Sequence, residues 1–142
     1  MASDDSATTV TVLGSGTCVP SLERSSCAVL VETGGERILF DSGPGTMGRL
    51  LQAGIQIFDL SFVCYSHFHP DHSGELVPLL FSNKYPDGSL RRRPLTIVAG
   101  RGFERFFSGL QGLYGRWIDL GPGLFVFRIG KTERGAETGF HS

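Results

Sequence analysis

The chain has 142 residues, which is enough for one compact domain with a core of its own. Hydrophobic residues make up 40% and charged residues 19%, the balance of an ordinary soluble globular protein. The net charge of -1 excludes a general attraction to polyanions, so a nucleic-acid substrate would require a local positive patch.

The N-terminal residues 1–7 are polar and acidic, the reverse of a signal peptide, and predict a disordered leader before one domain over residues 8–142. No apolar run approaches the ~20 residues that cross a bilayer. The odd set of Cys18, Cys27 and Cys64 has no CxxC spacing, so free thiols in a reducing cytoplasm are expected. Cys64 lies in an apolar run and is expected to be a buried small hydrophobe.

Three β-branched, apolar runs in the N-terminal part of the chain predict three strands. They cover residues 8–13, 27–33 and 36–41. The second and third are joined by Gly34-Gly35, and a two-glycine link of this kind predicts a β-hairpin. Thr46 follows a glycine-rich turn and can cap a helix through about Ala53, with Gly54 as a plausible stop.

The rest of the chain alternates strand and helix patterns. Strands are predicted over residues 60–65, 95–99 and 124–129, and the first two have the near-continuous apolar character of strands buried on both faces. A short helix is expected from Glu75 to Phe81, where Pro78 is tolerable only in the first turn.

An aromatic stripe follows the second of these strands. Its members recur with helical spacing and predict core packing rather than a ligand site: Phe103, Phe106, Phe107, Leu110 and Tyr114. Hairpins first and strand–helix alternation later predict an α/β fold with a mixed sheet and helices on its outer face.

One short basic run, Arg91-Arg92-Arg93, is the only candidate for a positive patch. A solvated loop is the simpler interpretation of it, and a nucleic-acid contact is the alternative.

The residues that carry chemistry follow directly after the predicted strand 60–65: His67, His69, Asp71 and His72. In an extended segment His67 and His69 project to the same side and provide half of a tetrahedral zinc shell. Pro70 turns the chain, so that Asp71 and His72 can face a second ion. A carboxylate beside imidazoles suits zinc, manganese or iron, and Asp71 could also accept a proton from a water activated by such ions. The alternative is a surface cluster of histidines without a ligand, but structural histidines rarely group in this way.

The segment His67-Phe68-His69-Pro70-Asp71-His72 resembles the HxHxDH signature of the metallo-β-lactamase superfamily. Residues 13–21 resemble the glycine-rich opening of its ribonuclease Z-like branch, and residues 40–46 resemble that branch's Asp-x-Gly-x-Gly-Thr turn. Ser73-Gly74-Glu75-Leu76 continues the similarity, which spans most of residues 10–100.

This resemblance implies an αββα sandwich, of which the chain would form the N-terminal half, and hydrolysis by a metal-bound hydroxide. It implies a first zinc-class ion on His67 and His69 and a second on Asp71 and His72. Asp41 would orient one of these ligands, although an Asp before a glycine turn can equally be a turn former. The substrate implied is a phosphodiester, RNA of the tRNA-precursor type above all, with a small ester as the other possibility.

The superfamily also supplies a histidine, a bridging aspartate and a final histidine from later sequence. No aspartate follows Asp119 here, and His141, the only later histidine, is more simply a tail residue. A second hypothesis is therefore a catalytically incomplete metal-binding half-domain. Such a domain would dimerise or pair with another chain to cover an exposed sheet face, or the domain over residues 8–142 would be a truncated one.

Overall fold

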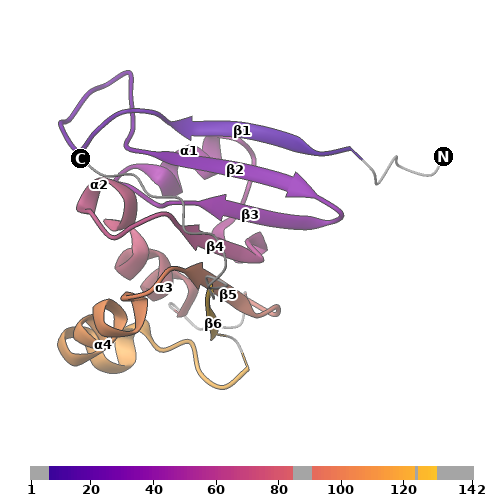
Figure 1. Ribbon diagram of the computed structural model, residues 1–142. Helices are drawn as coiled ribbons and strands as arrows, with labels where there is room; N and C mark the ends of the chain where they lie inside the picture. Colours follow the sequence, from indigo (N-terminus) through magenta and orange to yellow (C-terminus); the bar gives the residue numbers. More distant parts are fainter. Residues whose placement is uncertain (1–6, 85–90, 124, 131–142) are drawn as a thin grey trace, which may run out of the picture.

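The computed structural model describes residues 7–84, 91–123 and 125–130. Its strands form one six-stranded sheet in which the order in space is the order in the chain (Figure 1). They are β1 (Thr9–Gly14), β2 (Ala28–Thr33), β3 (Glu36–Phe40), β4 (Phe62–Tyr65), β5 (Leu95–Ala99) and β6 (Phe125–Ile129). The pairings β1–β2 and β2–β3 are antiparallel and the other three are parallel, so the predicted mixed sheet is confirmed.

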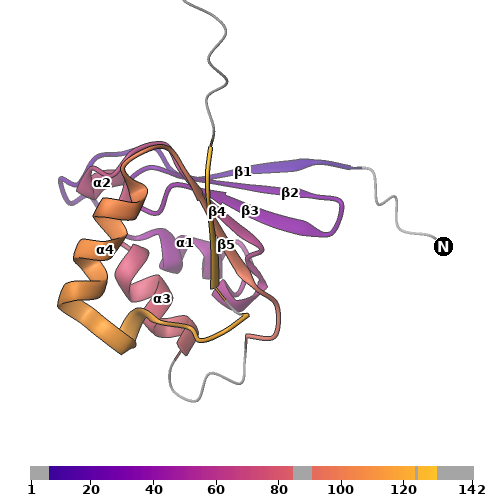
Figure 2. The ribbon, with the colours of Figure 1, turned by 60° about the horizontal axis from the view of Figure 1, so that its bottom comes forward.

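The helices connect the parallel strands and lie together on one side of the sheet. They are α1 (Thr46–Gln52), α2 (Pro70–Ser73), α3 (Leu76–Lys84) and α4 (Phe103–Tyr114), with 3-10 turns η1 (Ile57–Asp59) and η2 (Gly115–Ile118). Figure 2 shows α1, α3 and α4 below the sheet, with nothing of the described chain above it. The described residues thus form one sheet layer and one helix layer, as the N-terminal half of the predicted sandwich would.

The hydrophobic core lies between these two layers. Alternate strand residues point into it, among them Leu30, Leu39, Val63 and Ile97, and all four are completely buried. The helices contribute Leu79 and Leu80 of α3 and Phe103 and Phe107 of α4. The predicted aromatic stripe is therefore core, except that Tyr114 at the end of α4 is 40% exposed.

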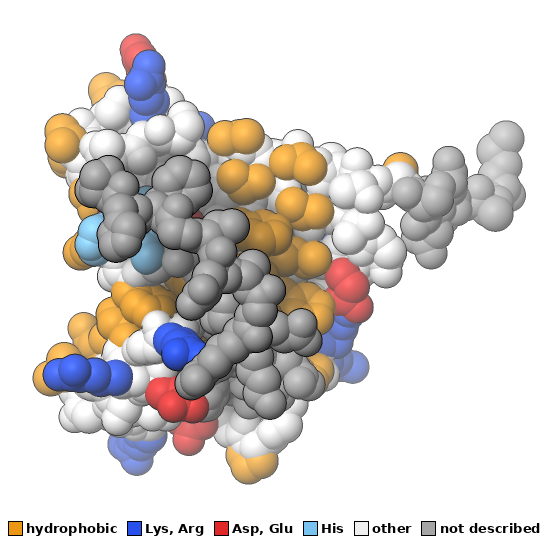
Figure 3. Space-filling model, in the orientation of Figure 1, with side chains coloured by type: hydrophobic (Ala, Val, Ile, Leu, Met, Phe, Trp, Pro, Cys, Tyr) orange, Lys and Arg blue, Asp and Glu red, His pale blue; other side chains and the backbone are white. Residues whose placement is uncertain are grey.

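The opposite face of the sheet, which we call the open face, is apolar as well. Register places its residues side by side across the strands: Val10, Val12, Val29, Val31, Ile38, Phe40, Phe62, Cys64 and Val98. Val10 and Val12 are 62% and 66% exposed, and hydrophobic side chains gather over β1–β3 in Figure 3. The prediction that β4 and β5 are buried on both faces is therefore wrong for the described residues. Cys64 is half-buried on the open face rather than buried.

Local signals of the sequence agree with the structure in most places. Gly34 and Gly35 both have positive φ, 55° and 74°, in the turn between antiparallel β2 and β3. The helix α1 is present but its N-cap is Gly45, so Thr46 is the first helical residue rather than the cap. Pro78 is the third residue of α3, within its first turn, although this helix begins at Leu76 and runs on to Lys84.

The basic run does not form a uniform loop. Arg91 is buried, while Arg92 and Arg93 are exposed. The Arg91 guanidinium donates to the carbonyl oxygens of Ile57, Phe58 and Leu60 and to Oδ1 of Asn83. Burial and, to a lesser extent, the nearby charge of Arg93 lower the pKa of Arg91 to about 10. The prediction of a solvated loop is thus wrong for Arg91, which is a structural cation under the sheet.

Two further predictions concern the ends of the chain and the membrane. The predicted leader and the tail residue His141 lie outside the described residues, apart from Ala7. Within the described part of the chain, none of the helices has the length and apolar character needed to span a membrane.

Candidate metal centre

The histidine-rich segment lies at the carboxyl end of β4, where α2 packs beside the turn that follows β3 (Figure 1). β4 ends at Tyr65, His69 is the N-cap of α2, and Pro70 is its first residue. Proline suits the first position of a helix, because the backbone N–H that proline lacks would have no acceptor within the helix there. His67 and His69 thus lie between the strand and the helix, while Asp71 and His72 belong to the helical turn.

Three predicted ligands come together as the spacing suggested. A ring nitrogen of His67, a ring nitrogen of His69 and a carboxylate oxygen of Asp71 all lie within 4.8 Å of one another. The two imidazole centroids are 4.7 Å apart and nearly perpendicular. Two neutral imidazoles and one carboxylate are a donor set that fits zinc or a similar divalent ion.

His72, the fourth predicted ligand, lies between two carboxylates. Its Nδ1 is 2.8 Å from Oδ2 of Asp41, and its Nε2 is 3.6 Å from Oδ2 of Asp71. If Nδ1 donates its proton to Asp41, the lone pair of a neutral ring is on Nε2 and faces Asp71. The structure therefore joins His72 to the other ligands on one side and to a supporting carboxylate on the other.

Asp41 is the buried support of this centre, with 6% of its surface exposed. Its Oδ1 accepts the Ser66 amide at 2.8 Å, and its Oδ2 accepts the Ser66 hydroxyl at 2.7 Å. Since that hydroxyl proton is used, the 2.9 Å contact between Ser66 Oγ and His67 Nδ1 must be donated by the imidazole. One carboxylate thus sets the tautomer of both His67 and His72, leaving each Nε2 free as a ligand.

Ser66 was not among the residues that the sequence singled out. Its place between the strand and the first histidine was the only available signal. Asp41 also has the turn geometry of the alternative interpretation, because its φ of 60° is the one positive value at a described non-glycine residue. Asp41 is therefore both a turn former and a support for the histidines, because the turn conformation directs its carboxylate toward them.

The turn after Asp41 is hydrogen-bonded directly to the histidine-rich segment. The Ser42 amide donates to the His72 carbonyl at 2.7 Å, and the Glu75 amide donates to the Ser42 carbonyl at 2.9 Å. A Cβ at Gly43 would lie 2.1 Å from the Asp71 carbonyl oxygen, so only glycine fits there. The glycine-rich turn and the histidine-rich segment are therefore one packed unit.

Two side chains complete this unit. Glu75 accepts the amides of Gly45 at 2.5 Å and Met47 at 2.7 Å, and so caps the N-terminus of α1 from the start of α3. Tyr65 shares a hydrogen bond of 2.5 Å with the Ser42 hydroxyl below the site. Burial raises the pKa of the Tyr65 phenol well above its ordinary value, and the bond to Ser42 opposes this shift only in part.

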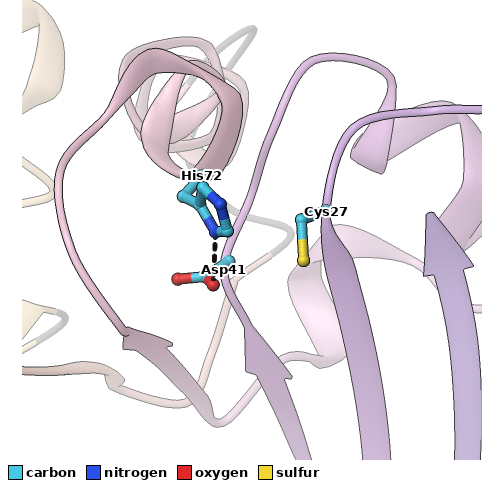
Figure 4. Close-up of side chains that lie close together, drawn as sticks. All are labelled: Cys27, Asp41 and His72. Carbon is cyan, nitrogen blue, oxygen red and sulfur yellow. Dashed lines mark hydrogen bonds and ion pairs between the residues drawn. The ribbon is translucent and has the colours of Figure 1, made fainter. Parts of the chain in front are cut away.

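Cys27, which the sequence did not connect with the centre, lies beside it. Its sulfur, a carboxylate oxygen of Asp41 and a ring nitrogen of His72 are all within 4.8 Å of one another (Figure 4). Burial raises the pKa of the Cys27 thiol, and the carboxylates of Asp41 and Asp71 raise it further. Cys18, Cys27 and Cys64 are all free, as predicted.

The later ligands of the superfamily have no counterpart among the described residues. In the parts of the chain that the structure covers, His67, His69 and His72 are the only histidines. The two groups of potential metal ligands found there both include a member of the predicted set or its support.

Comparison with known proteins agrees with this geometry. Residues 23–126 match the metallo-β-lactamase superfamily domain. A ribonuclease Z of Methanosarcina mazei is 34% identical over 134 residues, covering 85% of this chain and 43% of the relative. A ribonuclease Z of Streptomyces avermitilis is 43% identical over 103 residues, covering 70% of this chain and 32% of the relative.

Solved structures give the same picture for the fold. The short form of human tRNase Z superposes with a TM-score of 0.66 at 28% identity, covering 84% of this chain and 44% of that one. The metallo-β-lactamase fold protein YhfI from Bacillus subtilis superposes with a TM-score of 0.68 at 20% identity, covering 88% and 46%. The chain therefore spans less than half the length of each of these proteins.

Proposed function

The chain belongs to the metallo-β-lactamase superfamily, and we propose that it provides the metal-binding part of a metal-dependent hydrolase. The observation that carries this proposal is the convergence of His67, His69 and Asp71 on one point, with Asp41 orienting the neighbouring His72. A divalent ion held there would polarise a scissile oxygen and lower the pKa of a water molecule.

We propose that the ion is zinc and that the predicted ligands are divided between two such ions. His67 and His69 would hold a first ion through Nε2, and Asp71 and His72 would hold a second. Asp71 would also accept a proton from the attacking water, and the support for this role is that its carboxylate lies beside the two imidazoles. Asp41 and Ser66 would keep both imidazoles in the required tautomer.

The proposed substrate is a phosphodiester, and RNA is the proposed natural class. The support is the similarity to proteins named ribonuclease Z and tRNase Z. The net charge of -1 gives the chain as a whole no general attraction to RNA, and the burial of Arg91 removes one arginine of the basic run from the surface. Affinity for RNA would then have to come from another segment or another copy.

The open face supports a partner. An apolar sheet face of this kind is buried in a folded assembly, against a second copy, another chain or a further sheet. The second candidate function, a metal-binding half-domain without turnover, rests on the same observations together with the missing later ligands. The proposed location is the cytoplasm, since three free cysteines are typical of a reducing compartment.

The test is metal content per chain together with hydrolysis of bis-p-nitrophenyl phosphate. We expect two ions per chain and a turnover that falls by a factor of about 10²–10⁴ in Asp71→Asn. The matched control is Asp59→Asn in η1, which should leave turnover unchanged. One ion without turnover would favour the half-domain, and a chain that binds no ion would overturn both.

A further inference from the structure

A second group of potential metal ligands overlaps the centre described above, since it shares His72 and the supporting Asp41 with that centre. Cys27 precedes β2, Asp41 follows β3, and His72 belongs to α2, so three separate elements contribute (Figure 4). Their sulfur, carboxylate and imidazole atoms lie within 4.8 Å of one another, close enough for a small shift to place them around one ion. We call Cys27, Asp41 and His72 the inner triad, and His67, His69 and Asp71 the outer triad.

The backbone holds the inner triad together without a metal. The Gly43 amide donates to the Cys27 carbonyl at 3.3 Å, and the Asp41 amide donates to the Cys64 carbonyl at 2.8 Å. Asp41 is buried, while Cys27 and His72 are half-buried. The backbone therefore keeps the three side chains close to one another, and the half-buried positions of Cys27 and His72 leave them accessible to a small cation.

The two triads differ in the chemistry of their donors. The outer triad offers only nitrogen and oxygen, whereas the inner triad adds a thiol sulfur. Thiolate is the soft ligand that selects for thiophilic metals, and three ligands of mixed sulfur, nitrogen and oxygen leave one position open. We propose that the inner triad is a distinct binding site for a thiophilic divalent cation, such as Cd²⁺.

Occupation of the inner triad has a consequence for His72. Nδ1 is the ring nitrogen that faces Asp41, so it is the one placed to join an ion held by that carboxylate. A neutral imidazole has a single lone pair, so a metal on Nδ1 moves the proton to Nε2. The Nε2 of His72 then has no lone pair for an ion shared with Asp71. Loading the inner triad therefore removes His72 from the outer centre.

The test uses Cd²⁺ alone and reads the near-ultraviolet absorption of a thiolate-to-cadmium charge transfer. This signal requires sulfur, so the outer triad cannot produce it. The double variant Cys18→Ser/Cys64→Ser, which retains only Cys27, should keep the signal at one ion per chain. Cys27→Ser, which retains the other two thiols, should lose it.

Two further variants separate this proposal from the proposed hydrolase function. His69→Ala damages the outer triad and should keep the charge-transfer signal, whatever its effect on turnover. Asp41→Asn should weaken Cd²⁺ binding about 10–100-fold. Circular dichroism checks that each variant is folded, and Cys27→Ala replaces Cys27→Ser if the serine variant is not. A signal that persists in the folded Cys27 variant, or that is absent from the Cys18→Ser/Cys64→Ser protein, would overturn the inner site.

Discussion

The two faces of the sheet are made of the same kinds of side chain but have different surroundings. On the helix-covered face, Leu30 and Leu39 are completely buried. On the open face, Val10 and Val12 of the first strand are more than half exposed. Antiparallel strands with one face in water usually alternate apolar and polar residues, with the apolar ones covered. In β2 both faces are apolar from Ala28 to Val31, and in β1 the exposed residues of the alternation are the valines. The strands therefore have the composition of strands that are buried on both faces, although the described residues cover only one face of the sheet.

The largest difference in stability is expected between substitutions of Arg91, whose charge is buried on the helix side of the sheet, and of its exposed neighbour Arg92. Arg91→Ala removes the donor for three carbonyl oxygens and for Asn83, and we expect it to lower the free energy of unfolding by at least about 3 kcal/mol. Arg92→Ala, at the exposed neighbouring position, should change it by less than about 0.5 kcal/mol. Urea denaturation measures both, and equal effects would show that Arg91 is not a structural cation.

The next test makes the same substitution, valine to alanine, on each of the two faces of the sheet. Val63→Ala empties space in the buried core and should cost about 2–3 kcal/mol in urea denaturation. Val12→Ala on the open face should cost less than about 0.5 kcal/mol. A comparable cost at Val12 would mean that the open face is covered in solution.

Alkaline pH should act on the covered face through Tyr65. Because the folded protein raises its pKa, the phenol keeps its proton above pH 10, where the unfolded chain releases it. Rising pH therefore favours the unfolded chain, and this residue should lower the free energy of unfolding by about 1 kcal/mol between pH 10 and 11. Tyr65→Phe should show a shallower decrease between pH 10 and 11. Identical slopes in the two proteins would contradict the burial of this phenol.

The smallest change in stability is expected on the open face itself. Val10→Thr with Val12→Thr keeps the β-branched shape and should alter stability by less than about 0.5 kcal/mol. If this face binds a second copy, the same variant should reduce self-association in sedimentation velocity. Val19→Thr is the control, because Val19 is 75% exposed in the loop between β1 and β2. Unchanged self-association in the double variant would remove this face as a contact between copies.

Much of the fold was predictable because its signals are local. The hairpin depended on Gly34-Gly35, and the strand β5 was bounded correctly by its apolar run from Leu95 to Ala99. The proximity of the predicted ligands His67, His69 and Asp71 was predictable for the same reason, since they lie within a few residues of one another in the chain.

The features that escaped prediction depend on distant segments. Arg91 is buried because its hydrogen-bond acceptors lie at residues 57–60 and at Asn83. The sequence next to Arg91 gives no sign of these acceptors. Cys27 approaches His72 only because β2 and β3 pair and the turn after β3 packs against α2. Which face of β4 is covered is likewise decided by where the helices pack, so its apolar run could not settle it.

The order of the strands has a consequence for how the molecule assembles. Each new strand adds to the free edge left by the preceding one, and none is inserted between two others. A chain emerging from a ribosome could therefore build its sheet stepwise, without waiting for a distant partner. The segments 41–46 and 66–75, which form the metal centre, would meet as soon as β4 has docked on β3. The ligand cluster can thus be organised early, while β5 and β6 are still being synthesised.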